Sequence, residues 1–288
     1  MSSASPPILT VGVSKQYTTV AAAIAAAEDG ATIQVDAGTY TNDFATITHQ
    51  VTLQSVGGAV NMLATEPLTN KKGILVVDAS TTIQGFSFSG AAISQSDGNK
   101  GAGIRYEAGN LTLINDSFTN NQDGLLATPF VAGTGTIDIE NSEFANNGAG
   151  DGYSHNVYVG EVASFTFYQS FSHDANVGHD IKSRAEVTTI TNSRIEDGAG
   201  TASYTIDLPN GGAAVIRNNV IQQGANSQNP SIIAYGEEGN LHANSSLTVA
   251  NNTIVNDLTA HTPRGVWTRP TRRQHSPATQ FTASLPQH

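Results

Sequence analysis

Five stretches of the sequence share one pattern, in which apolar and polar residues alternate and an asparagine follows. They are Leu111–Phe118 (LTLINDSF), Ile137–Phe144 (IDIENSEF), Thr188–Ile195 (TTITNSRI), Ala214–Ile221 (AVIRNNVI) and Leu247–Ile254 (LTVANNTI). Two weaker copies, Thr82–Phe88 and Phe165–Phe171, keep the register without the asparagine. Successive copies lie about 24 to 33 residues apart, a period typical of solenoids. The repeat therefore predicts a stack of similar turns.

A second short strand is expected between successive copies. Its copies read GIRYEA (Gly103–Ala108), GLLATP (Gly124–Pro129), NVYVGE (Asn156–Glu161), DIKSRA (Asp180–Ala185), TIDLPN (Thr205–Asn210) and SIIAYGE (Ser231–Glu237). Alternation gives each strand one inward face, and stacked turns bury these faces on one another. Asparagine at the turn suits a left-handed backbone and lets stacked amides bond along the axis. We predict an all-β fold, a single-stranded right-handed parallel β-helix.

The N-terminal part predicts a capping helix over about residues 18–29, which begins at Thr18 and Thr19 and ends at Gly30. The strand after it, Ala31–Tyr40, ends in GTY. A helix followed by such a strand resembles the opening segment of the pectin-lyase-like superfamily, and the resemblance covers roughly residues 10–260. We expect a flexible N-terminus at 1–10, the β-helix at 11–260 and an atypical tail at 261–288. The tail carries a basic cluster of Arg269, Arg272 and Arg273.

Composition limits the classes of partner. The 288 residues carry a formal net charge of −11, which argues against sequence-nonspecific binding of nucleic acid. The absence of cysteine excludes thiolate zinc sites and a thiol nucleophile. The N-terminus lacks the pattern of a classical signal peptide, and the Ala-rich run Val20–Ala27 is too short to span a membrane. We expect a monomer that binds no membrane and is extracellular or cell-surface, exported by another route, with a cytoplasmic location as the alternative.

Aligning the second strands predicts which side chains point outward. The alignment takes Ile104, Leu125, Val157, Ile181, Ile206 and Ile232 as inward residues. One outward row then holds Arg105, Leu126, Tyr158, Lys182, Asp207 and Ile233, and the next holds Glu107, Thr128, Gly160, Arg184, Pro209 and Tyr235. The preceding row holds Asn156, Asp180, Thr205 and Ser231. Because rungs lie about 4.8 Å apart, Tyr158, Lys182 and Asp207 should stand side by side.

Two cations on one strand face are unusual in a chain that has only 13 Lys and Arg residues. This cluster suits β-elimination on a uronate, which needs a base, a cation for the carboxylate and a proton for the leaving oxygen. A lysine whose pKa is lowered by a neighbouring arginine can act as the base, and arginine binds carboxylates bidentately. The cluster resembles β-helical polysaccharide lyases of the alginate and pectate type. That resemblance implies Lys182 as base, Arg184 as carboxylate clamp or second catalytic cation, and Tyr158 as acid.

Further residues are expected to assist. His179 is a candidate for proton transfer or for contact with the substrate. The expected substrate-binding residues are Arg105, His155, Asn156, Asp180, Asp207 and Tyr235. The predicted function is a lyase of an acidic polysaccharide such as alginate, pectate or a bacterial exopolysaccharide. No cofactor is expected to be required, although Ca²⁺ could bridge the acidic surface and the substrate.

Several alternatives stay open. Lys182 and Arg184 could merely form surface ion pairs with Asp180, Asp207 and Glu186, which would be worth little. His155, His173, Asp174, His179 and Asp180 could hold a metal ion. A carboxylate pair could make a glycoside hydrolase, although the adjacent Asp pair of the β-helical galacturonan hydrolases is missing from these strands. C5-epimerisation, a non-catalytic glycan-binding or adhesive β-helix, and a purely structural solenoid remain as other functions.

Overall fold

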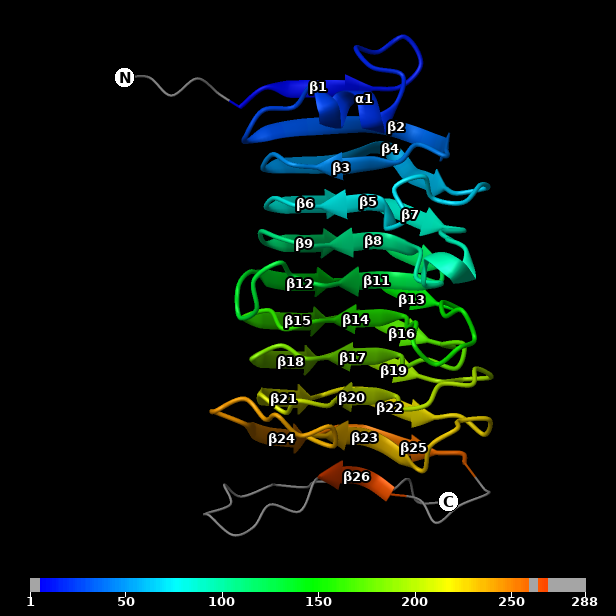
Figure 1. The fold of residues 1–288 in the computed structure, drawn as a ribbon, viewed down its shortest axis with the longest axis vertical. Coiled ribbons are helices and arrows are strands. Elements are labelled where there is room, and N and C mark those ends of the chain that lie inside the picture. Colours follow the sequence, from blue (N-terminus) through cyan, green and yellow to red (C-terminus); the bar gives the residue numbers. More distant parts are fainter. Residues whose placement is uncertain (1–5, 259–263, 269–288) are drawn as a thin grey trace.

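The strands of the chain pair in parallel with strands one turn away and build an elongated solenoid (Figure 1). The computed structural model describes residues 6–258 and 264–268. These residues make a 17-stranded sheet and a 9-stranded sheet. The predicted all-β parallel β-helix is confirmed, because every pairing between named strands is parallel.

The larger sheet consists of two stacks of parallel strands, which join through the long strands β2 and β4. One stack contains β1 (Ile8–Val11), β2 (Ala31–Thr41), β4 (Val51–Leu63), β6 (Thr81–Gln84), β9 (Leu111–Ile114), β12 (Thr136–Glu140), β15 (Ser164–Tyr168), β18 (Val187–Thr191), β21 (Ala213–Arg217) and β24 (Ser246–Ala250). The other contains β7 (Phe86–Ser89), β10 (Ser117–Thr119), β13 (Glu143–Ala145), β16 (Phe171–His173), β19 (Arg194–Glu196), β22 (Val220–Gln223) and β25 (Thr253–Asn256).

The nine-stranded sheet carries the second strand of each turn. It contains β3 (Ala45–Ile47), β5 (Gly73–Val77), β8 (Ala102–Tyr106), β11 (Asp123–Ala127), β14 (Val157–Val159), β17 (Ile181–Ser183), β20 (Ile206–Leu208), β23 (Ser231–Tyr235) and β26 (Arg264–Thr268). All six strands expected between copies of the repeat are therefore present, as β8, β11, β14, β17, β20 and β23.

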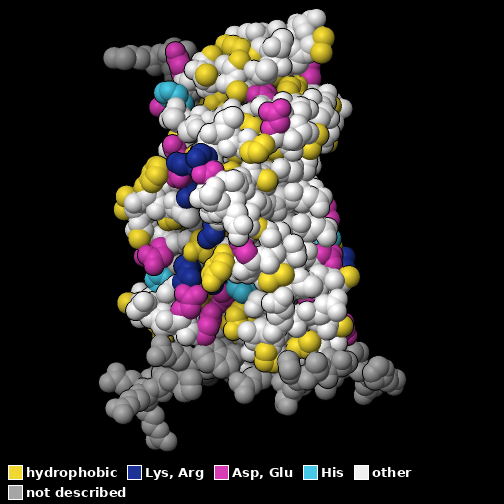
Figure 2. All heavy atoms as spheres, turned by 45° about the vertical axis from the view of Figure 1, so that its right-hand side comes forward, with side chains coloured by type: hydrophobic (Ala, Val, Ile, Leu, Met, Phe, Trp, Pro, Cys, Tyr) yellow, Lys and Arg dark blue, Asp and Glu magenta, His cyan; other side chains and the backbone are white. Residues whose placement is uncertain are grey.

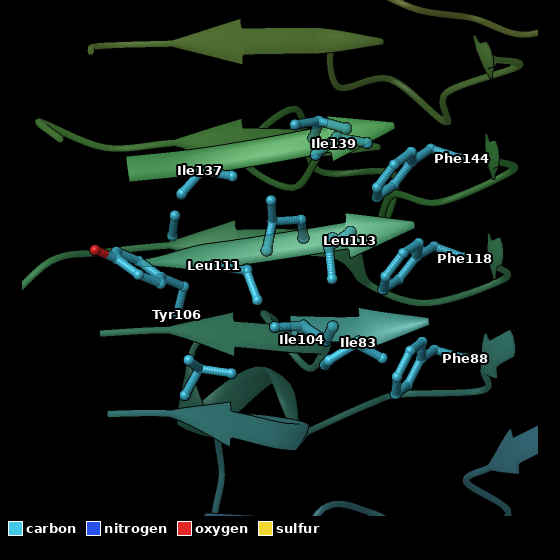
Figure 3. Packing of buried hydrophobic residues seen from close by; sticks show 14 of the residues in the cluster. Ile83, Phe88, Ile104, Tyr106, Leu111, Leu113, Phe118, Ile137, Ile139 and Phe144 are labelled. Carbon is cyan, nitrogen blue, oxygen red and sulfur yellow. The ribbon is translucent and has the colours of Figure 1, made fainter. Parts of the chain in front are cut away.

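Like residues stack on like residues inside the solenoid (Figure 3). The rings of Phe88, Phe118 and Phe144, from three successive turns, stack with centroids 5.0 and 4.4 Å apart. Ile83 pairs in register with Leu113, and Leu113 pairs with Ile139. These side chains are buried, so each turn shields its neighbours from water.

The repeated asparagine lies where the chain turns from one stack of strands of the larger sheet to the other. Asn115, Asn141 and Asn218 have φ angles of 55°, 49° and 59°, the left-handed conformation that was expected. The ladder along the axis is made by the next residue instead. In this ladder the backbone N–H of each residue donates to the side-chain oxygen of the next residue. The residues are, in order, Asp116, Ser142, Ser170, Ser193, Asn219 and Asn252. The short side chain after the left-handed residue thus satisfies a buried amide in each turn.

Both ends differ from the expected boundaries. A short helix, α1 (Val20–Ala25), replaces the longer helix expected over 18–29; the Thr19 hydroxyl accepts a hydrogen bond from Ala22 N–H. Its role as a cap stays a prediction. Strand β1 begins at Ile8, before the expected start of the β-helix, and β26 adds to the nine-stranded sheet within the expected tail. Residues 1–5 and the basic cluster of Arg269, Arg272 and Arg273 lie outside the described residues.

Helices are few and short. Besides α1, the described residues contain one 3-10 helix, η1 (Gln95–Asp97). Within the described ranges, no helix has the length and apolar character needed to cross a bilayer.

The phenylalanine stack makes a first prediction. Phe118→Ala should lower the free energy of unfolding by about 3–5 kcal/mol, because it opens a cavity between two stacked rings. Denaturant unfolding followed by circular dichroism measures this change. Phe130→Ala is the matched control, since Phe130 is 64% exposed and should lose little. Equal losses in the two variants would contradict this account of the core.

Candidate functional site

The ionisable groups gather in a groove over the nine-stranded sheet. Its volume is about 450 Å³, and it is lined by Lys100, Arg105, Leu126, Thr128, Gly152, Tyr153, His155, Tyr158, Lys182, Arg184 and Glu238. Four cations and one carboxylate line it, in a chain of net charge −11. On the face drawn in Figure 2, Lys and Arg side chains follow one another along the solenoid axis beside Asp and Glu side chains. A local positive field can therefore coexist with an acidic protein.

A larger hollow, of about 700 Å³, lies near the N-terminal end and is lined in part by Asp36, Tyr40 and Asp43. Its Asp43 carboxylate stabilises the fold by capping a helix. Asp43 accepts hydrogen bonds from the N–H groups of Val20 and Ala21, at the start of α1, at 2.6 and 2.9 Å. The groove over the nine-stranded sheet is thus the better candidate for chemistry.

The predicted outward row is confirmed over five rungs. Arg105 pairs with Leu126, Leu126 with Tyr158, Tyr158 with Lys182, and Lys182 with Asp207. Tyr158, Lys182 and Asp207 therefore stand on adjacent rungs, as predicted. Arg105 lies at the far end of the same row, three rungs from Lys182.

The predicted register is wrong at the last rung. Ile206 pairs with Ile233, so Ile233 rather than Ile232 continues the inward row. Tyr235 consequently points inward, where its hydroxyl donates to the Gly212 carbonyl at 2.6 Å. Tyr235 is not the outward substrate contact that was expected. Strand β23 (SIIAY) is buried throughout and does not alternate between apolar and polar residues, so its sequence carried no information about its faces.

Asn156 and Asp180 were also expected to point outward, and both are fully buried. They precede the first residues of β14 and β17, where the chain is still turning and alternation does not apply. The Asn156 amide donates to the His173 carbonyl at 2.8 Å and accepts from Asn147 at 2.9 Å. Burial raises the pKa of Asp180 well above its usual range. Both side chains support the turn beneath the groove.

Lys182 and Arg184 share one carboxylate. The Lys182 ammonium lies 3.1 Å from Glu238 Oε1. Arg184 Nη2 donates to the same oxygen at 3.0 Å, and Nη1 lies 2.7 Å from Oε2. Arg184 Nε also donates to the Tyr158 hydroxyl at 3.1 Å. The two cations therefore hold a carboxylate in a forked geometry beside a phenol.

The charge state of Lys182 differs from the expectation. A lowered pKa was predicted from the neighbouring arginine. Burial does act in that direction, but the carboxylates of Asp207 and Glu238 outweigh it and raise the pKa of Lys182. Asp207 Oδ2 lies only 2.8 Å from the ammonium and is buried beneath it. Asp207 is therefore an ion-pair partner of Lys182 and does not line the groove as a substrate contact.

The two histidines form a buried stack on the row three residues before Tyr158, Lys182 and Asp207. The rings of His155 and His179 stack with centroids 4.7 Å apart, and the Tyr204 ring lies beside His179 at 5.3 Å, tilted by 38°. His155 Nδ1 accepts the His179 N–H at 3.0 Å, and His179 Nδ1 accepts the Tyr204 N–H at 3.1 Å. Each imidazole therefore carries its proton on Nε2.

This arrangement decides what the histidines can do. Burial lowers the pKa of His179 to about 4, against the opposing effect of Asp207, and lowers that of His155 well below its usual value. His179 Nε2 lies 3.3 Å from Asp207 Oδ2. With Nδ1 engaged and Nε2 protonated, neither ring offers a free lone pair to a proton or a metal ion. His155 instead presents a neutral N–H donor to the groove.

A carboxyl pair lies behind Lys182. Burial and the neighbouring Asp207 raise the pKa of Glu237 to about 8, so Glu237 is protonated at neutral pH. Ligand oxygens of Asp207, Glu237 and Glu238 lie within 4.8 Å of one another. The Lys182 ammonium already supplies the cation that these carboxylates need, so the cluster does not favour Ca²⁺.

Three side chains that line the groove were not singled out from the sequence, namely Glu238, Lys100 and Tyr153. One pattern could have revealed the buried stack: His155, His179 and Tyr204 each precede by three residues the members Tyr158, Lys182 and Asp207 of the outward row. No comparable pattern marks Glu238, because it lies in the turn that follows β23.

Neither a protein-family model nor a curated protein matches the chain. Among solved structures, pectate lyase Pel9A matches with a TM-score of 0.58 and 14% identity, over 91% of this chain and 80% of that one. The pectin methylesterase from Aspergillus niger matches with a TM-score of 0.54 and 15% identity, over 96% and 94%. At such identities the likenesses show the fold alone, a parallel β-helix. A lyase and an esterase share it, so the fold does not select a reaction.

The imidazole of His179 provides a second prediction. Its ¹⁵N resonances should report a proton on Nε2 from pH 5 to 8 and a titration midpoint at about pH 4. The physical reason is that burial disfavours the charged ring while the Tyr204 N–H occupies Nδ1. A midpoint near the free-histidine value of about 6.5, or a proton on Nδ1, would contradict the assignment.

Proposed function

We propose that this protein is a polysaccharide lyase that cleaves a uronate-containing polysaccharide by β-elimination. The observation that carries the proposal is the forked binding of the Glu238 carboxylate by Lys182 and Arg184. A uronate carboxylate presents the same two oxygens to the same cations. The shared fold with pectate lyase Pel9A is consistent with a polysaccharide substrate.

In the proposed reaction, the substrate carboxylate replaces Glu238 on Arg184. Charge neutralisation there makes the C5 proton of the uronate more acidic. Lys182 in its neutral form removes this proton, a C4–C5 double bond forms, and the C4–oxygen bond breaks. The Tyr158 hydroxyl, whose oxygen accepts from Arg184, donates its proton to the leaving oxygen. One proton is taken and one is returned, so the step balances.

His155 and Asp207 complete the arrangement. The neutral His155 N–H lines the groove and can donate to a sugar oxygen without adding charge. Asp207, which lies 3.3 Å from His179 Nε2, positions the Lys182 ammonium through their ion pair. Glycoside hydrolysis is less well supported, because the protonated Glu237 lies behind Lys182 and does not line the groove.

Substitution of the proposed base is the direct test. Lys182→Ala and Lys182→Arg should each lower kcat by about 10³-fold on the best substrate among alginate, pectate, hyaluronan and bacterial acidic exopolysaccharides. Ultraviolet absorbance of the unsaturated uronate is the readout. Lys182→Arg should retain substrate binding, because it keeps the positive charge.

The matched control for both variants is Lys15→Ala, because Lys15 forms an exposed ion pair with Asp36 and neither residue lines the groove. Its turnover should equal that of the wild type. No unsaturated product from the wild type, with or without Ca²⁺, would reject the lyase. Reducing ends would then identify a hydrolase, and binding without turnover a glycan-binding protein.

The pH dependence tests the same role. Because Asp207 and Glu238 raise the pKa of Lys182, the neutral amine is scarce at pH 7. As pH rises, kcat/KM should increase by roughly tenfold per unit into the alkaline range, because deprotonation creates the base. A profile that is flat, or that falls above neutrality, would show that Lys182 does not act as the base.

A further inference from the structure

The groove extends well beyond the proposed reacting centre. Its far end is lined by Lys100 and Arg105, with Tyr153 beside them. None of the three is needed for the proposed elimination. The question is what this end of the groove can bind.

The cations at the far end are poorly neutralised. Lys100 forms no ion pair within residues 6–258 and 264–268. Arg105 Nε lies 3.5 Å from Glu107 Oε1, whereas Lys72 takes the other oxygen of Glu107 at 2.5 Å. Arg105 Nε is buried without a hydrogen-bond partner. Lys182 and Arg184, by contrast, are matched by Asp207 and Glu238. The positive charge at the far end is therefore less fully neutralised than that of Lys182 and Arg184, and the far end should bind an anion.

An exposed aromatic ring completes this end. Tyr153 is 72% exposed. Its loop is tied down, because the Tyr153 N–H donates to Asp151 at 2.9 Å and Asn99 donates to the same carboxylate at 3.2 Å. Asn99 precedes Lys100, so the ring and the cation are held by adjoining loops. An aromatic face beside a cation suits a sugar that carries an acidic group.

The spacing along the solenoid relates the two ends. Arg105 and Lys182 are separated by three rungs through Leu126 and Tyr158. At about 4.8 Å per rung, this amounts to about 14 Å. One pyranose unit of an extended polysaccharide advances by roughly one rung. The two cationic ends therefore match anionic sugars three units apart.

We propose that Lys100, Arg105 and Tyr153 form a second subsite, which binds an anionic sugar three units from the one held by Lys182 and Arg184. The site then recognises an acidic oligosaccharide of at least four units. The proposal rests on the proposed function for its kinetic readout, whereas its binding readout does not require a reaction.

The experiment compares oligouronates of two to six units, prepared from the polymer that the wild type cleaves best. With the wild type, kcat/KM should rise sharply at four units. Lys100→Ala and Tyr153→Ala should each lower kcat/KM for the pentamer by about tenfold, the effect of one lost charged or stacking contact. Neither should change it for the trimer. Lys15→Ala serves as the control and should change neither value, because Lys15 pairs with Asp36 and neither residue lines the groove.

Other outcomes overturn the proposal. Equal losses for trimer and pentamer, or no loss at all, would show that Lys100 and Tyr153 bind no distant sugar. If the wild type cleaves no oligouronate, the lyase assignment fails, and calorimetric binding of oligogalacturonate and oligomannuronate pentamers decides the second subsite. Binding that weakens about tenfold in Lys100→Ala supports it, and binding that is absent or unchanged rejects it.

Discussion

The structure depends on the burial of each turn by the turns on either side. No single turn has enough inward surface to form a core, so Phe118 is shielded only because Phe88 and Phe144 stack against it. This requirement places inward residues in register along the axis. Outward residues must then follow the same register, which brings Tyr158, Lys182 and Asp207 together from three separate turns. The groove is thus a consequence of core packing.

Much of this could be predicted from the sequence, because the repeat reports the inward face directly. Where strands alternate, as in Val157–Val159 and Ile181–Ser183, the predicted rows are right. Prediction failed where alternation stops. Strand β23 is uniformly buried, and Asn156 and Asp180 lie in turns, so a period of two residues said nothing about their direction.

The chemistry of the groove was harder to predict than its position. The charge state of Lys182 depends on Asp207, which the repeat places on the next rung, and on Glu238, which is 56 residues away and lies in a turn. The tautomer of His179 depends on a backbone N–H of the next rung. The repeat pattern carries no information about the contacts of Glu238 and of this N–H. Side-chain identity on a row is therefore predictable, whereas protonation requires the three-dimensional contacts.

The ion pairs of Lys182 and Arg184 with Glu238 have a thermodynamic consequence. Two long cationic side chains are already ordered and partly dehydrated in the free protein, so folding rather than association bears that cost. In the proposed function, the substrate carboxylate exchanges with Glu238, which returns to water as the substrate carboxylate loses its hydration. The charge held by the pair is the same before and after the exchange. The proposed binding site is thus preorganised before the substrate binds, at a cost to the stability of the folded protein.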